Sequence, residues 1–300
     1  MAKSLLITGG TGFIGQVLCQ KLIEKGYALT VLSRQKEADV RAQCGRVTSI
    51  QSLSELTDHS GFDGVINLAG EGIAEKRWSE ERKQALRDSR IALTDHLVQT
   101  MRTFKRKPPV LVSGSAIGFY GDQGDRLVDE NTQPNGDFSH RLCRDWENSA
   151  NAATDDGIRV CFSRTGLVMG RDGGFLQRML LPFKLCLGGR LGSGEQYMPW
   201  IHRQDVVNAL VWMLENDSAT GPYNVVSPNP VTNREFTRTL GRVLNRPAPF
   251  PAPAFVLRAA FGEMSRLLLT GQKARPERLL NEGFEFRFPE LEKALVDAVG

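Results

Sequence analysis

The chain has 300 residues, which is enough to bury about three quarters of the unfolded chain's surface in a large core. Its 38 basic and 34 acidic side chains give a formal net charge of +4 and are interspersed, so they form no basic stripe of the kind that binds nucleic acid. The most apolar segment, 179–187, contains Pro182 and Lys184 and falls short of the ~20 residues that a membrane helix needs. We therefore expect a soluble globular protein that binds neither nucleic acid nor a membrane.

Cysteine and histidine usage predicts a reducing compartment and no metal site. The five cysteines are odd in number, scattered, and include no Cys-x-x-Cys pair, which is typical of free thiols in the cytoplasm. We expect Cys19 and Cys161 in the core. Residues 1–4 run directly into an apolar strand pattern, so we expect no signal peptide. The four histidines show no metal-ligand spacing.

An N-terminal segment predicts a turn that binds a dinucleotide. Residues 5–15 read LLITGGTGFIG, an apolar strand pattern that enters a glycine-rich turn and is followed by an amphipathic helical pattern. Glycines at such a turn let the backbone approach a pyrophosphate, and the helix N-terminus offers it free N–H groups. The context of strand, turn and helix makes this spacing much more specific than a bare match. The expected cofactor contacts in the turn are Gly9, Thr11, Gly12, Phe13, Ile14 and Gly15.

The end of the second expected strand, 29–34, indicates which dinucleotide binds. NAD sites usually carry Asp or Glu here, about 20 residues past the glycines, to accept a hydrogen bond from the ribose 2′-hydroxyl. This strand ends in Ser33 and Arg34 instead. A hydroxyl and a guanidinium bind a 2′-phosphate that a carboxylate would repel. The sequence therefore predicts NADP(H) rather than NAD(H).

The order of elements predicts an α/β fold with a Rossmann-type, doubly wound parallel sheet. Further strand patterns at 64–70, 110–113 and 158–165 alternate with helical patterns, the clearest at 80–104 and 141–153. We expect residues 1–170 to form the NADP-binding domain, whose sheet can recruit segments near 195–230. Residues 171–300 would form a smaller substrate lobe over the carboxyl edge of the sheet, with helices at 175–185, 204–215, 234–244, 254–269 and 289–299.

Several motifs resemble the extended short-chain dehydrogenase/reductase superfamily, which includes nucleotide-sugar epimerases and dehydratases. They are the glycine turn, NLAG at 67–70, SGSA at 113–116 with the following Tyr120, and WIHRQDV at 200–206. The resemblance covers nearly the whole chain. Three further segments are similar to an "epimerase family protein" subgroup that has its own C-terminal domain of unknown function, which would be 247–299 here. They are residues 69–78, 187–194 and 271–273.

The resemblance implies acid–base chemistry beside a nicotinamide, but this chain departs from the usual residues. In the superfamily a Tyr carries the proton, a Lys four residues later lowers the Tyr pKa, and a Ser polarises the substrate oxygen. Ser115 stands at the Ser position, whereas the positions that match Tyr and Lys hold His140 and Arg144. Three interpretations stay open: His140 moves the proton with Arg144 near the ribose, Tyr120 moves it, or the site binds cofactor without the usual chemistry.

The resemblance also places further residues along the cofactor. Leu68, Ala69 and Gly70 would pass under the adenine ribose, Arg90 would face the cofactor from its helix, and Val168 would lie along the nicotinamide. Extended members often form homodimers through a four-helix interface, for which the helices at 80–104 and 141–153 are the candidates here.

Two hypotheses about function follow. The first is a cytoplasmic NADP(H)-dependent oxidoreductase or epimerase-like enzyme that transfers hydride at a secondary alcohol or ketone of a small molecule, such as a nucleotide sugar. The second is a regulatory protein that has kept the cofactor site, lost catalysis, and reports the NADPH level to a protein partner. The missing Tyr–Lys pair motivates the second hypothesis.

Overall fold

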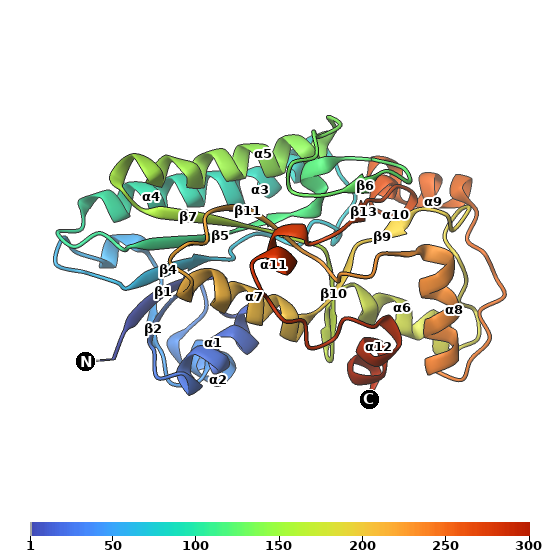
Figure 1. The fold of residues 1–300 in the computed structure, drawn as a ribbon, viewed down its shortest axis with the longest axis horizontal. Helices are drawn as coiled ribbons and strands as arrows, with labels where there is room; N and C mark the ends of the chain where they lie inside the picture. Colours follow the sequence, from blue (N-terminus) through green and yellow to red (C-terminus); the bar gives the residue numbers. More distant parts are fainter. Residues whose placement is uncertain (1) are drawn as a thin grey trace.

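A parallel sheet of seven strands forms the centre of the molecule (Figure 1). The structure, a computed structural model, describes residues 2–300, so Met1, on which the signal-peptide expectation partly rests, lies outside the described residues. The strand order is β11-β7-β5-β4-β1-β2-β3. The strands of this sheet are β1 (Ser4–Thr8), β2 (Ala28–Leu32), β3 (Thr48–Ile50), β4 (Gly64–Asn67), β5 (Val110–Ala116), β7 (Arg159–Thr165) and β11 (Gly221–Val225). The order turns back beside β1, which creates the crevice where such sheets bind ligands.

Helices cover both faces of the sheet, so the predicted doubly wound α/β fold is confirmed (Figure 1). One face carries α1 (Gly15–Glu24), α2 (Glu37–Cys44) and α7 (Arg203–Glu215), and the other carries α3 (Glu80–Arg87), α4 (Leu93–Thr103) and α5 (Phe138–Asn151). Successive residues of β1 explain this arrangement, because Leu5 and Ile7 enter the core under α1 and α7 while Leu6 enters the core under α4.

The expected helix at 80–104 contains a wider turn. A π-helical turn at Asp88–Ala92 joins α3 to α4, and Arg90 lies within it. Such turns are found frequently at functional sites, because the extra residue redirects a side chain and a carbonyl. Here the Thr94 hydroxyl donates to the Arg90 carbonyl at 2.6 Å.

The C-terminal part of the chain forms a second, mostly helical layer beside the carboxyl edge of the sheet (Figure 1). The expected helix at 254–269 breaks at Gly262, whose φ of +58° lies in the left-handed region. The helices here are α6 (Gly174–Lys184), α8 (Asn233–Val243), α9 (Ala254–Phe261), α10 (Arg266–Leu269) and α12 (Leu291–Val299). The short helix α11 (Glu277–Asn281) packs instead against β11 at the edge of the central sheet.

Short strands and 3-10 turns connect these layers. The strands pair in twos, β8 with β10, β9 with β12, and β6 with β13. They are β6 (Leu127–Val128), β8 (Leu167–Gly170), β9 (Tyr197–Met198), β10 (Trp200–His202), β12 (Val231–Thr232) and β13 (Lys273–Ala274). The 3-10 turns are Leu53–Glu55, Ile117–Tyr120, Ala152–Asp156 and Gly262–Ser265.

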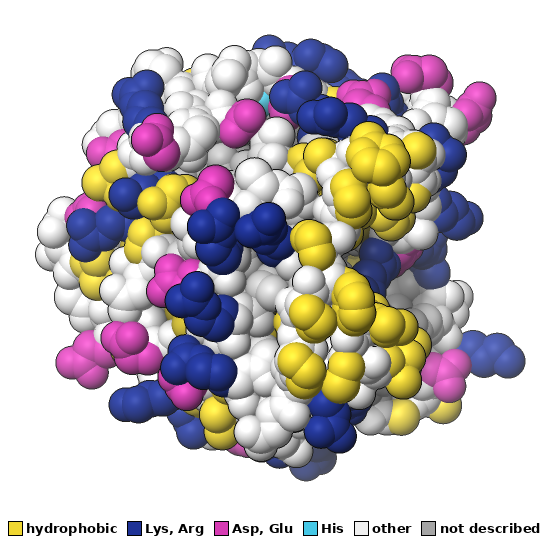
Figure 2. Space-filling view, turned by 90° about the vertical axis from the view of Figure 1, so that its right-hand side faces the viewer, with side chains coloured by type: hydrophobic (Ala, Val, Ile, Leu, Met, Phe, Trp, Pro, Cys, Tyr) yellow, Lys and Arg dark blue, Asp and Glu magenta, His cyan; other side chains and the backbone are white. Residues whose placement is uncertain are grey.

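A separate apolar core holds the C-terminal layer together around Trp200 and Phe236, with contributions from α6, α8 and α12. This layer also exposes several large apolar side chains, and the space-filling view shows apolar and basic side chains gathered next to one another at this end of the molecule (Figure 2). They include Leu181, Leu185, Leu187, Phe250, Phe255 and Val256. Within residues 2–300 no helix is both long and apolar enough to cross a membrane.

Candidate cofactor and active site

The turn between β1 and α1 is built so that only glycine fits at its closest approaches. A Cβ at Gly9, whose φ is +71°, would lie 2.6 Å from the Leu68 carbonyl. A Cβ at Gly15 would lie 2.2 Å from the Gly9 carbonyl oxygen, which itself accepts a hydrogen bond from the Gly12 N–H at 3.0 Å. The partly exposed Thr11 and the exposed Gly12 lie at the open side of this turn. The bare backbone and the N-terminus of α1 therefore form a cradle that suits a pyrophosphate.

Phe13 and Ile14 anchor this turn. The Phe13 ring packs against Gly173 and Gly174, where an added Cβ would come within 2.4 Å and 2.9 Å of it. The Arg203 guanidinium lies 4.4 Å from the centre of the ring, and Ile14 packs into the core below the sheet. Phe13 thus ties the glycine turn to the loop between β8 and α6, which fixes the turn's position before any ligand arrives.

At the end of β2 the exposed Arg34 follows the buried Ser33. Ser33 is buried, and its Oγ accepts a hydrogen bond from the Gln35 N–H at 3.2 Å. Arg34 is exposed, and its guanidinium forms no hydrogen bond or salt bridge with any of residues 2–300. Because its five donors have no protein partner, Arg34 can bind a phosphate in a bidentate manner.

The end of β4 is locked to the end of β1 by buried hydrogen bonds. The Thr8 hydroxyl donates to Asn67 Oδ1 at 2.6 Å, and Asn67 Nδ2 donates to Thr94 Oγ1 at 2.8 Å. The Ala69 N–H donates to Thr8 Oγ1 at 3.2 Å. These contacts set the course of the partly exposed Leu68 and Ala69, directly beside Gly9.

Arg90 lies against the exposed Gly70, where an added Cβ would come within 3.0 Å of the guanidinium carbon. Its Nη2 donates to the Glu71 carbonyl at 2.8 Å, its Nη1 donates to the Leu86 carbonyl at 3.2 Å, and the guanidinium stacks over Trp146. Burial lowers the pKa of Arg90 from its usual value. Arg90 therefore holds the loop at 70–71, next to the residues that the family resemblance predicts under the adenine ribose.

A buried polar network fills the space behind the end of β5. Ser115 Oγ donates to Glu147 Oε1 at 2.6 Å, and Glu147 accepts two hydrogen bonds of 2.8 Å from the Arg164 guanidinium. Arg164 Nη1 donates to the Tyr120 hydroxyl at 2.9 Å, which donates to Asn224 Oδ1 at 2.8 Å. Burial alone would lower the pKa of Arg164, but the paired Glu147 carboxylate outweighs it and raises that pKa. The Arg164 guanidinium therefore stays charged in spite of its burial.

The network changes what Ser115 and Tyr120 can do. Tyr120 is fully buried, burial raises its pKa to about 12, and its hydroxyl already has two partners. It is therefore poorly placed to move a substrate proton, contrary to the second sequence interpretation. Ser115 gives its hydrogen to Glu147, so its oxygen is free to accept a hydrogen bond but not to donate a second one.

His140 lies in the first turn of α5, against the 3-10 turn that follows Ser115. Its Nδ1 lies 2.7 Å from the Phe119 carbonyl oxygen, an acceptor, so Nδ1 carries the hydrogen and Nε2 is left as the basic nitrogen. The Asp137 carboxylate caps the helix by accepting from the His140 N–H at 2.8 Å. This tautomer is the one that a proton acceptor at Nε2 requires.

The sequence also assigned Arg144 and Val168 to the site, and the structure places them as follows. Arg144 follows His140 by one turn of α5, but it is exposed and its guanidinium binds Asp145 with contacts of 2.9 Å and 2.8 Å, so its charge is paired at the surface, unlike the role that the match to Lys implied. Val168 lies on β8, half-buried on the core next to Ile201. Val168 thus lies shortly before the loop between β8 and α6, which contacts Phe13.

The sequence interpretation missed Glu147, Arg164, Asn67 and Thr94. One signal was available for Arg164, which is a charged residue close behind the apolar run 160–162 of a predicted strand and, if buried there, needs a counter-charge. Within residues 2–300 no group of three or more His, Cys, Asp or Glu side chains is arranged to hold a metal ion.

Comparison with known proteins identifies the family of the chain. Residues 5–226 match the family model of the NAD dependent epimerase/dehydratase family, and residues 252–298 match a domain of unknown function, DUF1731. The chain is 40% identical over 298 residues to Epimerase family protein Mb2239 of Mycobacterium bovis, covering 98% of this chain and 97% of that protein. It is 38% identical to the chloroplastic SDR39U1 homolog of Arabidopsis thaliana, covering 96% and 84%.

Solved structures give the same result. The human epimerase family protein SDR39U1, crystallised with NADPH, matches with a TM-score of 0.89 and 36% identity over 98% of both chains. UDP-glucuronic acid 4-epimerase from Bacillus cereus matches with a TM-score of 0.78 over 98% of this chain and 97% of that chain, but at 16% identity it shows the fold alone. The resemblance to the subgroup with its own C-terminal domain is therefore confirmed, and the fold is of the NAD(P)-binding type.

Proposed function

The chain belongs to the NAD dependent epimerase/dehydratase family, and on this basis we propose that it is an NADP(H)-dependent enzyme that interconverts a secondary alcohol and a ketone of a small molecule. The observation that carries the proposal is the glycine cradle at the N-terminus of α1 together with the unpaired Arg34 at the end of β2. The NADPH in the human relative's structure supports the choice of cofactor.

The residues present fit this cofactor. The backbone of Gly9, Gly12 and Gly15 would hold the pyrophosphate, and Arg34 would bind the 2′-phosphate. When bound, the nicotinamide supplies a hydride donor or acceptor. The protein's part is to bind and orient the substrate oxygen and to move one proton.

We assign the first of these tasks to Ser115 and the proton transfer to His140. Because Ser115 donates to Glu147, its Oγ would accept a hydrogen bond from a neighbouring hydroxyl of the substrate and orient the molecule, which leaves the proton of the reacting hydroxyl for His140. His140 Nε2 would take the hydroxyl proton during oxidation and return it during reduction, since imidazole serves as a general acid and base in enzymes. The Phe119 carbonyl keeps the histidine in the tautomer that this role needs.

We expect His140→Phe to lower turnover about a hundredfold while the Kd for NADPH stays unchanged, because general acid–base catalysis contributes at least this much. The measurement is NADPH oxidation with a panel of ketones, aldehydes and keto-sugar nucleotides, first on the unaltered protein and then on the variant. His96→Phe, at an exposed histidine on α4, is the matched control and should behave as the unaltered protein does.

The same assay decides between the enzyme and the NADPH-dependent regulator. The pairing of Arg144 with Asp145 favours the regulator, because that guanidinium is engaged at the surface and does not take the role of the family's lysine. Oxidation of NADPH by any member of the panel supports the enzyme, whereas tight NADPH binding without turnover across the panel supports the regulator. Unchanged turnover in His140→Phe would remove His140 from the mechanism.

A further inference from the structure

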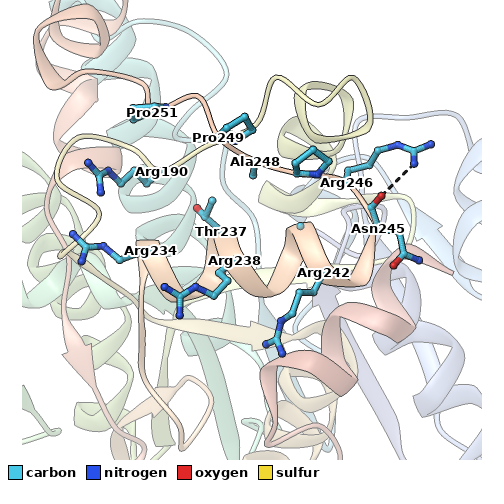
Figure 3. A pocket seen from close by; sticks show the side chains of 12 residues that line it. Arg190, Arg234, Thr237, Arg238, Arg242, Asn245, Arg246, Ala248, Pro249 and Pro251 are labelled. Atoms are coloured by element: carbon cyan, nitrogen blue, oxygen red, sulfur yellow. Dashed lines mark hydrogen bonds between the residues drawn. The ribbon is translucent and has the colours of Figure 1, made fainter.

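A basic groove lies in the C-terminal layer, formed by parts of the chain that the cofactor turn does not use. It has a volume of about 800 Å³ and runs between α8 and the segment Pro247–Pro251 (Figure 3). Its lining contains five arginines and, among the described residues, no acidic side chain. They are Arg190, Arg234, Arg238, Arg242 and Arg246.

The arginines are arranged in a row. Arg234, Arg238 and Arg242 follow one another at intervals of four residues on α8, so they lie on one side of the helix with a rise of about 6 Å per step. Arg246 continues the row just past the helix, and Arg190 reaches the groove from the loop before β9. In Figure 3 the Thr237 side chain points from α8 toward the proline segment, and the arginine side chains extend outward in several directions, Arg238 and Arg242 on the side of α8 away from the prolines.

Acidic partners neutralise this charge only in part. Arg234 pairs with Glu195, and the Arg242 guanidinium lies 3.6 Å from the Glu292 carboxylate. Arg190, Arg238 and Arg246 form no salt bridge with any of residues 2–300. Several like charges held along one groove raise the local positive potential, which favours an anion.

Thr237 supplies an independent sign of a ligand. The residue is 5% exposed, lines the groove between the arginine positions, and its Oγ1 has no hydrogen-bond partner within residues 2–300. A buried hydroxyl without a partner is costly, and a bound ion is one of the partners that satisfies such a group. An anion's oxygen is an acceptor that would satisfy this hydroxyl.

The opposite wall is preformed and apolar. Pro247, Ala248, Pro249 and Pro251 line it, and backbone hydrogen bonds fasten this segment to the 188–192 loop. They run from Ala252 N to Arg190 O at 2.9 Å, from Phe250 N to Gly188 O at 3.2 Å, and from Gly192 N to Ala252 O at 2.8 Å. The groove therefore needs little rearrangement to accept a ligand.

We propose that this groove binds the oligophosphate group of a small molecule, such as a nucleoside triphosphate or a phosphorylated coenzyme, at a site separate from the glycine turn. The rim arginines would bind the phosphate oxygens, the Thr237 hydroxyl would donate to one of them, and the proline wall would contact the organic part. The volume lies within the range of small-molecule pockets. The lining offers no aromatic side chain on which the bases of a nucleic acid would stack.

The test is calorimetric titration with inorganic tripolyphosphate and, separately, with ATP, at constant ionic strength, with and without saturating NADPH. Arg238→Ala should weaken tripolyphosphate binding at least about tenfold and Thr237→Val by about threefold, since each removes one charge-assisted or neutral hydrogen bond. Arg258→Ala, at an exposed arginine on α9 outside the groove, is the matched control and should bind as the unaltered protein does.

The two ligands and the NADPH comparison separate the outcomes. Equal affinities for tripolyphosphate and ATP, or tighter binding of ATP, both support the proposal and show how much the proline wall contributes. Absence of tripolyphosphate binding, equal loss in Arg238→Ala and Arg258→Ala, or competition between tripolyphosphate and NADPH would overturn it. Binding of a single-stranded oligonucleotide without binding of tripolyphosphate would assign the groove to nucleic acid instead. None of these results depends on whether the protein oxidises NADPH.

Discussion

Gly15→Ala is expected to weaken NADPH binding by about a hundredfold, which corresponds to a loss of about 3 kcal/mol of binding free energy. The added Cβ would lie 2.2 Å from the Gly9 carbonyl oxygen and 2.6 Å from that of Gly10, and both are backbone atoms that cannot turn aside. Either the turn opens or α1 shifts, and in both cases the N–H groups at the start of the helix leave the phosphate position.

The same variant should also lose about 1–3 kcal/mol of unfolding free energy, since overpacking a closed contact strains the structure around it. Calorimetric titration gives the binding loss, and urea denaturation shows whether the variant is folded under the conditions of the titration. Gly136→Ala is the matched control, because a Cβ there meets no atom within 4 Å and both properties should stay unchanged. Wild-type affinity in folded Gly15→Ala would refute the assignment of this turn to the pyrophosphate.

The second large effect is expected at Glu147. Glu147→Ala should lower the free energy of unfolding by about 3–5 kcal/mol, because it leaves the buried Arg164 charge without its partner. It also removes the acceptor that Ser115 uses, so the serine hydroxyl becomes free to rotate. Denaturation with urea at neutral pH measures the loss.

Two further variants establish the cause. Glu147→Leu combined with Arg164→Met should recover most of the lost stability, because no charge is then left buried. Glu37→Ala breaks the exposed pair with Arg41 and should change stability by no more than about 1 kcal/mol. An effect of Glu147→Ala as small as that of Glu37→Ala would contradict the account of a buried ion pair behind the site.

Much of the fold was predictable because its central strands are buried on both faces and read as continuous apolar runs. The strands β1, β4 and β5 are of this kind, and the glycine turn marks where the first helix begins. By contrast, β3 has only three residues, too few for a pattern to be recognised. The break at Gly262 and the π turn at Arg90 depend on how their segments pack, which local propensity does not encode.

Less of the site was predictable, and the helix α5 shows why. The spacing of four residues suggested that Arg144 would lie beside His140, yet the buried side of this helix runs through Cys143, Trp146 and Glu147. Arg144 lies one residue beyond that side and reaches the surface. Which residue of a helix faces the sheet depends on the rotation of the helix, and two charged side chains at neighbouring positions give no sign of it.

The central claim is that the glycine turn and Arg34 select NADPH, and it is tested most directly by titrating the protein with NADPH and, separately, with NADH. The account predicts at least about tenfold tighter binding of NADPH, with that preference lost in Arg34→Ala, since a charged hydrogen bond contributes about 1.5–3 kcal/mol. Arg41→Ala, at an exposed arginine of α2 that pairs with Glu37, should keep the preference. Equal dissociation constants for the two cofactors, or an unchanged preference in Arg34→Ala, would contradict the account.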